Sequence, residues 1–451
     1  MRRALDVRRR QLLAGVFASL AAGLAPRSAT ALSRTPTGGA LRFSIPWSLA
    51  SLDPHDAFDP VAAIFGPAVF DTLFVPDPRV GVRASLADGL PTKEAGVTTL
   101  KLRHGVRTSR GAILDAGDVL ASLKRAKARG AAPLLEPLGD MQRVSADPYA
   151  LTFPKATLSA VIRATTSPLT AIVSRAFDPK SPDGTGAFAP SLRGGHLELS
   201  RNVLSASGAA FLDRIVVSPA ADLRESLRDF EAERDDIGWL GSGVFGSRKG
   251  AVKFDLGAVA FVALAGPRDG ARGKPGALQR LVDGVPRGKL AHLGLGALPP
   301  GSDGTAWDGG DVDLWVESGA PHLFAVAEAL RDALSRTDNA ITLKRASREE
   351  VLARRRRGDA GLSLHVVRPI LPGSFGAMLG LAELEEPTRA KELAKLGGKI
   401  AEGRSARDVA SELRVAVVGE IRVAGGVVPG FHLAPLTGGG WDLGATHVEK
   451  S

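Results

Sequence analysis

Two segments of the chain contain residues that could bind phosphate or act as a nucleophile, and each lacks a residue that the chemistry requires. Gly273-Lys274 lies in a glycine-rich stretch, but Arg268 stands where a phosphate-binding loop has its first glycine, and Pro275 replaces the Ser or Thr. Gly373 to Gly376 resembles the turn around a catalytic serine, but Pro372 replaces its first glycine. The sequence therefore predicts no catalytic residues, no cofactor and no enzyme activity.

Metal and anion sites are also poorly supported. The eight histidines are scattered and no His-Glu-x-x-His occurs, so surface positions or hydrogen-bonded core positions explain them better than metal binding does. The run Arg354 to Arg357 could bind an anion, but at the end of a predicted helix it is more typical of a solvated face, which the helix dipole favours. We predict no metal site.

Aromatic and charged residues at strand ends are better candidates for ligand binding. Trp47 follows the first predicted strand, Trp239 follows a short apolar strand, and the loop from Arg368 to Phe375 follows another. In an open α/β sheet, ligands bind beyond the carboxyl ends of the strands. We therefore predict that Trp47, Trp239, Arg368 and Phe375 contact a ligand. The alternative for the tryptophans is packing in the core.

Hydrophobic periodicity in the first part of the chain predicts both strands and helices. Residues 41–45 and 99–103 alternate polar and apolar side chains, as half-buried strands do. The apolar residues of 119–123 recur at helical spacing. Either Asp115 or Asp118 is placed to cap that helix.

The second part of the chain alternates helices with strands, which is the pattern of an α/β layer. We predict helices over residues 323–334 and 347–357, and strands over 313–316 and 341–343. Ser405-Ala406-Arg407-Asp408 is a capping box that predicts the start of a last long helix.

The segment from Leu86 to Leu123 carries a pattern that extends beyond local structure. A strand is followed by Leu102-Arg103-His104-Gly105-Val106, by Gly111, and by Ala116-Gly117-Asp118-Val119-Leu120-Ala121-Ser122-Leu123. This order resembles the signature region of the bacterial extracellular solute-binding proteins of family 5. These are the periplasmic dipeptide-, oligopeptide- and nickel-binding receptors of ABC transporters.

Further segments resemble the same family in the same order, from about residue 41 to residue 240. They are the turn Ser51-Leu52-Asp53-Pro54-His55, a helix expected at Val69-Phe70-Asp71-Thr72-Leu73, the strand Asp147 to Phe153, the turn Gly184-Thr185-Gly186-Ala187-Phe188, and the segment Leu197 to Asn202. In the glycine turn, Ala187 takes the place of the family's proline. Beyond residue 240 the resemblance is thin.

The resemblance implies an α/β chain with the two-lobed periplasmic binding protein fold of type II, including the extra inserted subdomain of the larger peptide-binding receptors. The implied divisions are residues 1–31 for the signal peptide, 32–55 with 178–258 and 425–451 for lobe I, 56–177 for the inserted subdomain, and 259–424 for lobe II.

The function that the resemblance implies is the substrate-binding component of an ABC importer, which captures a peptide-like or other small solute between two lobes. Peptide-binding members use an acidic residue in the loop that here runs from His365 to Phe375, and this loop has Arg368 and no carboxylate. Because a guanidinium suits carboxylates and phosphates, an anionic solute is expected. The alternative is a degenerate regulatory or scaffold protein with no transported cargo.

Residues 1–31 resemble an export signal. An arginine-rich start precedes an uncharged apolar stretch from Leu12 to Leu24, and Ala29-Thr30-Ala31 is a small-residue cleavage pattern. The apolar stretch is shorter than the roughly 20 residues of a membrane-spanning helix. Arg9-Arg10-Gln11-Leu12-Leu13 also resembles a twin-arginine signal, and an ordinary secretory signal rich in arginine is the alternative.

Composition is consistent with a soluble exported protein. The net charge is +10, and the six arginines and one aspartate of residues 1–31 contribute half of it, so a nucleic-acid partner is not expected. The chain has no cysteine, which excludes disulfides, thiolate metal sites and a lipid anchor on cysteine. We predict a periplasmic monomer whose partners are a small-molecule or peptide ligand and an ABC permease in the inner membrane.

Overall fold

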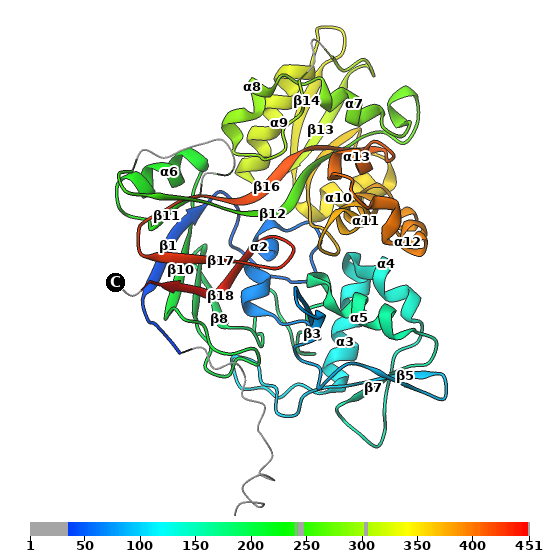
Figure 1. The fold of residues 1–451 in the computed structure, drawn as a ribbon. Coiled ribbons are helices and arrows are strands. Elements are labelled where there is room, and N and C mark those ends of the chain that lie inside the picture. Colours follow the sequence, from blue (N-terminus) through cyan, green and yellow to red (C-terminus); the bar gives the residue numbers. More distant parts are fainter. Residues whose placement is uncertain (1–34, 240, 242–247, 302–304, 450–451) are drawn as a thin grey trace, which may run out of the picture. The chain divides into compact units, whose positions relative to one another are not determined.

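The computed structural model describes residues 35–239, 241, 248–301 and 305–449 (Figure 1). The predicted signal peptide lies outside these residues. The described chain mixes helices and strands, as predicted for the α/β class. Among its helices, none is long and apolar enough to cross a membrane.

A ten-stranded mixed sheet forms the framework of the fold, in the order β14-β13-β15-β12-β16-β11-β1-β10-β9-β8. Its strands are β1 Ala40–Ile45, β8 Phe188–Arg193, β9 His196–Arg201, β10 Arg214–Pro219, β11 Ile237–Trp239, β12 Val252–Ala265, β13 Val312–Glu317, β14 Ile341–Ala346, β15 Leu362–Val367 and β16 Val415–Val427. β1 and β9 therefore share one sheet. The predicted lobe I requires this, although its boundaries stay a prediction.

β12 and β16 are the long antiparallel strands at the middle of this sheet (Figure 1). β11 pairs with the C-terminal part of β16, and β15 pairs with the C-terminal part of β12, so these two strands connect the two halves of the sheet. Their register shifts between Asp255 and Ala258 and again between Ala258 and Ala260. Such bulges bend a strand and increase its twist. The predicted boundary between the lobes, residue 258, falls at this irregularity.

Several α-helices alternate with the strands in the second half of the chain. They are α7 Ala277–Asp283, α8 Arg287–Leu290, α9 Pro321–Leu334, α10 Arg348–Arg357, α11 Ser374–Glu385, α12 Pro387–Leu396 and α13 Ala406–Ala410. Two predictions need correction here. The capping box of Ser405 and Asp408 forms, but α13 has only five residues because the chain turns into β16 soon after it. Arg355 is buried and donates to the carbonyl of Gly266, so the arginine run is not uniformly solvated.

The region between β1 and β8 forms its own small sheets and helices. Its elements are α2 Pro60–Val69, β2 Phe74–Asp77, β3 Gly81–Ala84, β4 Thr92–Glu94, β5 Val97–Lys101, α3 Ala116–Ala126, α4 Ala132–Leu135, β6 Gln142–Arg143, β7 Ala150–Phe153 and α5 Leu158–Thr166. Asp115 caps α3, and Asp118 completes a capping box with it. Leu100 and Leu102 are both buried, as the alternating pattern predicts.

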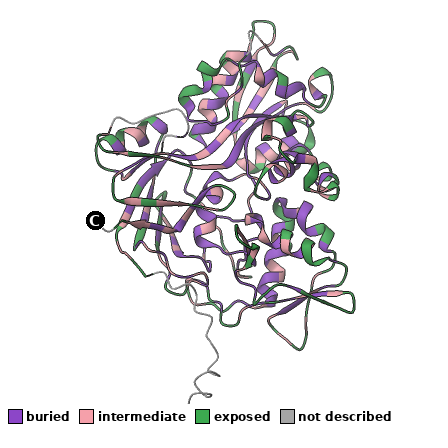
Figure 2. Ribbon diagram, viewed as in Figure 1, coloured by how far each residue is buried: buried purple, intermediate pink, exposed green. Residues whose placement is uncertain are grey.

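Two clusters of buried apolar side chains form the core. In Figure 2, buried residues (purple) run along much of the central strands β12 and β16. Gly184 and Gly186 show why the glycine motif matters for packing: a Cβ atom on Gly184 would lie 2.0 Å from the carbonyl oxygen of Val69. These glycines allow their segment to pack against the end of α2. The sequence predicts a helix at residues 69–73, but α2 ends at Val69, so that prediction is wrong.

A C-terminal hairpin completes the described chain, with strands β17 Phe431–Pro435 and β18 Trp441–Val448 (Figure 1). Its tip contains Gly438, Gly439 and Gly440, all with positive φ, a conformation that favours glycine. The N–H of Gly440 donates to the carbonyl of Leu256 on β12. The tip is therefore fixed to the irregular part of a central strand. A further α-helix, α6 Leu223–Glu231, precedes β11.

Candidate functional site

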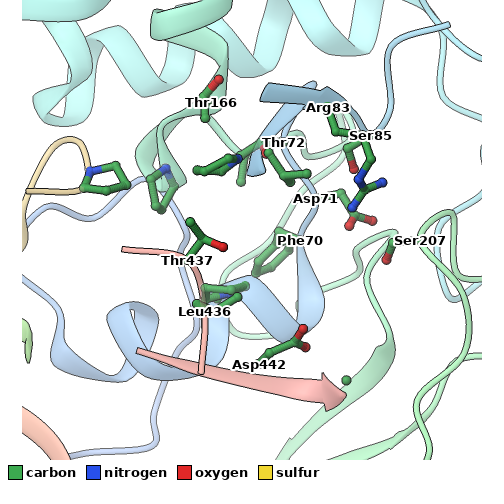
Figure 3. Close-up of a pocket in the computed structure, with 18 of the residues that line it drawn as sticks. Phe70, Asp71, Thr72, Arg83, Ser85, Thr166, Ser207, Leu436, Thr437 and Asp442 are labelled. Carbon is green, nitrogen blue, oxygen red and sulfur yellow. The ribbon is translucent and has the colours of Figure 1, made fainter. Parts of the chain in front are cut away.

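A cavity of about 410 Å³ lies between α2, the β2–β3 hairpin, the tip of the β17–β18 hairpin and the loop after β15 (Figure 3). Its volume falls within the range of roughly 300 to 1,000 Å³ typical of small-molecule sites. Its charged lining residues are Asp71, Asp77, Arg83, Arg368 and Asp442. Hydroxyl groups and several prolines form much of the remaining wall. The lining thus offers hydrogen-bond donors and acceptors within an apolar frame.

One side of the cavity is built by the residues that follow α2. Because the helix ends at Val69, the next residues are extended and enter the cavity wall. The Asp71 carboxylate accepts a hydrogen bond of 2.7 Å from Thr185, which fixes its orientation. Arg83, on β3, extends toward Asp71 (Figure 3) and lies 3.9 Å from Asp77. This side therefore carries charges of both signs.

Asp77 is a turn residue as well as a lining residue. Its carboxylate accepts the backbone N–H groups of Arg79 and Val80, and these bonds hold the pKa of Asp77 below its usual range. The carboxylate is therefore ionised at neutral pH.

The hairpin tip forms the opposite side. Leu436 and Thr437 project from it toward Phe70 (Figure 3). Asp442, at the start of β18, accepts the N–H of Ala445 at 3.0 Å, which fixes one carboxylate oxygen. A Cβ atom on Gly438 would lie 2.7 Å from Pro372, so only a glycine lets the tip approach the loop after β15 this closely.

Arg368 is the one predicted ligand residue that borders this cavity. It is 3% exposed, its Nη1 donates to the carbonyl oxygens of Pro54 and Asp56 at 2.9 and 2.8 Å, and its backbone N–H donates to Ala57. Burial lowers its pKa, and the nearby aspartates oppose that shift. Both side-chain bonds to described residues use Nη1, so Nε and Nη2 have no acceptor within the described chain. The guanidinium is fixed at one end and can still donate at the other.

Trp47 and Trp239 lie together, away from this cavity. They are 4% and 1% exposed, their rings meet edge to face at 5.8 Å, and Trp47 also contacts the ring of His322 at 5.7 Å. The spaces that they border have volumes of only about 10 Å³. Their packing here is that of core residues, and a contact with ligand stays a prediction.

Phe375 is not brought to the cavity either. It lies in the first turn of α11 and packs, partly buried, against the apolar cluster formed by the helices of that region. Its role in ligand binding likewise stays a prediction.

Sequence reasoning missed most of the cavity. Asp71 and Thr72 were assigned to a helix, although the structure ends that helix before them. The Gly438 to Gly440 run was an available signal for a tight turn, but nothing local to it indicates which residues the turn faces.

The predicted turn Asp53-Pro54-His55 has a structural role next to the cavity. Arg125 donates to both carboxylate oxygens of Asp53 at 2.7 and 2.6 Å, and Arg129 adds a bond of 3.0 Å. Burial opposes ionisation of Asp53, but the hydrogen bonds and the charge of Arg125, together with His55, outweigh that effect, so the pKa of Asp53 is lowered. The turn is thus joined to α3 through a buried charged network.

His55 belongs to the same network. Its Nδ1 accepts from Arg125 at 2.8 Å, which places the ring proton on Nε2, where it donates to the carbonyl of Ala171 at 2.8 Å. Burial lowers its pKa to about 4, so the ring is neutral at pH 7. This is a hydrogen-bonded core histidine. Across the part of the chain that the structure describes, no group of three or more His, Asp or Glu residues is arranged to hold a metal ion.

Comparison with known sequences gives limited information. No family model matches the chain. The glutathione-binding protein GsiB of Salmonella paratyphi A is 36% identical over 80 residues, which are 18% of this chain and 16% of that protein. The match therefore spans about a sixth of the relative's length.

Comparison with solved structures covers nearly the whole chain. NikA from Brucella suis, in complex with Fe(III)-EDTA, has a TM-score of 0.62 at 15% identity over 91% of this chain and 100% of its own. AppA from Bacillus subtilis, in complex with a nonapeptide, has a TM-score of 0.64 at 11% identity over 92% and 100%. AgaA from A. tumefaciens R10, in complex with agropinic acid, has a TM-score of 0.64 at 16% identity over 92% and 99%.

These similarities confirm the fold class predicted from the sequence, the two-lobed fold of periplasmic binding proteins. NikA and AppA are family 5 solute-binding proteins, so the chain shares its fold with proteins of that family. The similar structures are binding proteins rather than enzymes.

Proposed function

We propose that this protein, which has the fold of the family 5 solute-binding proteins, is the periplasmic substrate-binding component of an ABC importer. The observation that carries the proposal is the cavity of about 410 Å³, enclosed by segments from distant parts of the chain and lined by fixed polar groups. A scaffold with no cargo would not require such a cavity. Two lobes connected by β12 and β16 would close around the solute, and the closed form would deliver it to a permease.

The solute that we propose is peptide-like or another small molecule with an anionic group at Arg368. Nε and Nη2 of Arg368 can donate to a carboxylate or phosphate, and the buried setting strengthens such a bond. The structure of AgaA holds agropinic acid, so this fold can bind an acidic small molecule. Asp71 and Asp442 could receive donors of the same solute.

Replacement of Arg368 by alanine is expected to weaken the binding of an anionic solute about 10- to 150-fold, because it removes a charge-assisted hydrogen bond of about 1.5 to 3 kcal/mol. The measurement is a thermal-shift screen of acidic, neutral and cationic solutes with the wild type, followed by titration of any stabilising solute against Arg368→Ala. A ligand at about 100 times its Kd should stabilise the native state by roughly 2.7 kcal/mol.

Trp315, outside the cavity, offers a control substitution, Trp315→Phe, which should leave the solute affinity unchanged. If only cationic solutes stabilise the protein, or if Arg368→Ala binds the acidic solute as tightly as the wild type does, the anionic assignment is wrong.

We further propose export to the periplasm as a soluble monomer without a lipid anchor, with cleavage after Ala31. The arginine-rich start, the apolar stretch of residues 12–24 and the absence of cysteine support this. We expect N-terminal sequencing of the exported protein to begin at Leu32. An uncleaved product in the membrane fraction would contradict the proposal.

A further inference from the structure

The wall of the cavity is rich in proline. Six of the residues that line it are prolines from separate parts of the chain: Pro67, Pro76, Pro78, Pro168, Pro372 and Pro435. Three of them are half-buried and three are exposed, so their rings keep apolar surface that a solute can cover. Because proline has no backbone N–H, these positions give the wall apolar surface without main-chain donors. Phe70 and Leu436 extend this apolar surface (Figure 3).

Many of the other main-chain donors in the wall are already used within the protein. The N–H groups of six further lining residues each donate to a main-chain carbonyl, and these residues are Phe70, Ser85, Ala171, Arg368, Leu436 and Gly439. Together with the prolines they make up half of the lining positions. At these positions the main chain has no N–H left to donate to a solute.

The strand that borders the cavity, β2, is unsuited to pairing with an extended peptide. It pairs with β3 in a two-stranded sheet, so among the described strands its other edge has no partner. A proline inside a strand is tolerated where its nitrogen faces away from the partner strand, so Pro76 removes a donor from that edge. Pro78 follows directly after the strand and has no N–H either. A peptide that adds to a sheet edge depends on such main-chain hydrogen bonds.

The charges of the lining favour a solute with a single anionic group. Arg368 can donate to that group through Nε and Nη2. The carboxylates of Asp71, Asp77 and Asp442 line the same cavity and would repel further negative charge. A phosphate monoester carries between one and two charges at pH 7, so a carboxylate suits this lining better.

We propose that the solute is a small non-peptide acid with one carboxylate and an apolar ring, aromatic or alicyclic. The carboxylate pairs with Arg368, and the ring packs on the proline side chains, as aromatic rings pack on prolines in the recognition of proline-rich segments. This inference rests on the proposed function, because it assumes that the cavity is the solute site.

A thermal-shift comparison of four probes tests the solute class. Phenylacetate and cyclohexanecarboxylate carry the proposed carboxylate and ring, phenylacetamide has a ring without the charge, and trialanine has a carboxylate on an extended peptide. At equal concentrations and pH 7, the two ring acids should raise the melting temperature of the wild type more than phenylacetamide and trialanine do.

Proline variants test the role of the wall. Pro76→Ala and Pro435→Ala each remove one or two methylene groups from it, so calorimetric titration should show phenylacetate binding about 4- to 15-fold more weakly. Pro219→Ala, at the end of β10 and outside the cavity, is the matched control and should bind phenylacetate as the wild type does. The melting temperature of each variant without solute shows whether it is folded.

The solute class is wrong if trialanine stabilises the protein more than the ring acids do, if neither ring acid stabilises it, or if both folded proline variants bind phenylacetate as tightly as the wild type. The proposed function would survive each of these results as long as another solute binds through Arg368. It fails separately if the screen of acidic, neutral and cationic solutes finds none that stabilises the protein.

Discussion

Substitution of Asp53 by alanine is expected to lower the free energy of unfolding by about 3 kcal/mol. The change leaves Arg125 and Arg129 without their shared carboxylate, and loss of one partner of a buried ion pair costs about 3 to 5 kcal/mol. The loss should lie at the lower end of this range, because the side chains of Arg125 and Arg129 are 25% and 49% exposed and can be hydrated by water in the variant. Chemical denaturation at pH 7 measures this.

An exposed ion pair provides the comparison. Asp308 pairs with Arg272 but is 66% exposed, so Asp308→Ala should cost well under about 1 kcal/mol. Equal losses in the two variants would show that the Asp53 network contributes no more than a surface pair. Asp53 does not line the cavity that we propose as the solute site, although the neighbouring carbonyl of Pro54 accepts from Arg368.

Acidification is expected to destabilise the fold through His55 and His365. Burial lowers the pKa of His55 to about 4 and that of His365 to about 3, whereas in the unfolded chain both titrate near 6.5. Below pH 6.5 the unfolded chain therefore binds protons that the folded protein does not. The stability is complete above pH 6.5 and falls as the pH drops toward the folded values, by about 3 kcal/mol for each histidine at pH 4.

Asp59 acts in the opposite direction. Burial raises its pKa to about 6, so the folded protein takes up this proton first and gains stability as the pH falls below 6. The pH dependence of the wild type's free energy of unfolding therefore combines both effects. A variant is needed to measure the contribution of a histidine alone.

The variant His365→Leu measures the contribution of His365 to this pH dependence. Between pH 7 and pH 4, the free energy of unfolding of this variant relative to the wild type should rise by about 3 kcal/mol, because the variant has no proton to take up there. Ser363→Ala removes the hydroxyl that contacts His365 but keeps the ring, so it should follow the wild-type pH dependence. Parallel curves for His365→Leu and the wild type would show that the ring titrates normally in the fold.

The elements of the sheet could be predicted from local patterns. Residues 41–45 alternate because one side of β1 faces the core, and the predicted helix 347–357 begins at the serine that caps α10. The last helix was predicted too long because a capping box marks where a helix begins and says nothing of where it ends. Local signals thus identify the elements better than their lengths.

The cavity could not be predicted in the same way. Asp71 and Thr437 face the same space only because the hairpin tip reaches β12 and Pro372, and no periodicity in the sequence encodes that contact. Arg368, which borders the cavity, was chosen as a candidate because it follows a strand, where loops converge in an α/β sheet. Trp47 also follows a strand, but it is buried against Trp239 and does not border the cavity. A position after a strand therefore indicates the region of a cavity but not which residues line it.

The position of β16 affects how the protein can be synthesised. This strand lies between β11 and β12, yet it starts at Val415, close to the C-terminal end of the chain. On a translating ribosome, neither β11 nor β12 can pair with β16 until almost the whole polypeptide has emerged. Pairings between such distant segments form slowly. A chain released before Val415 lacks β16, the strand that joins the two halves of the sheet. A stop codon at this position should therefore yield a product in which the two halves of the sheet cannot pair.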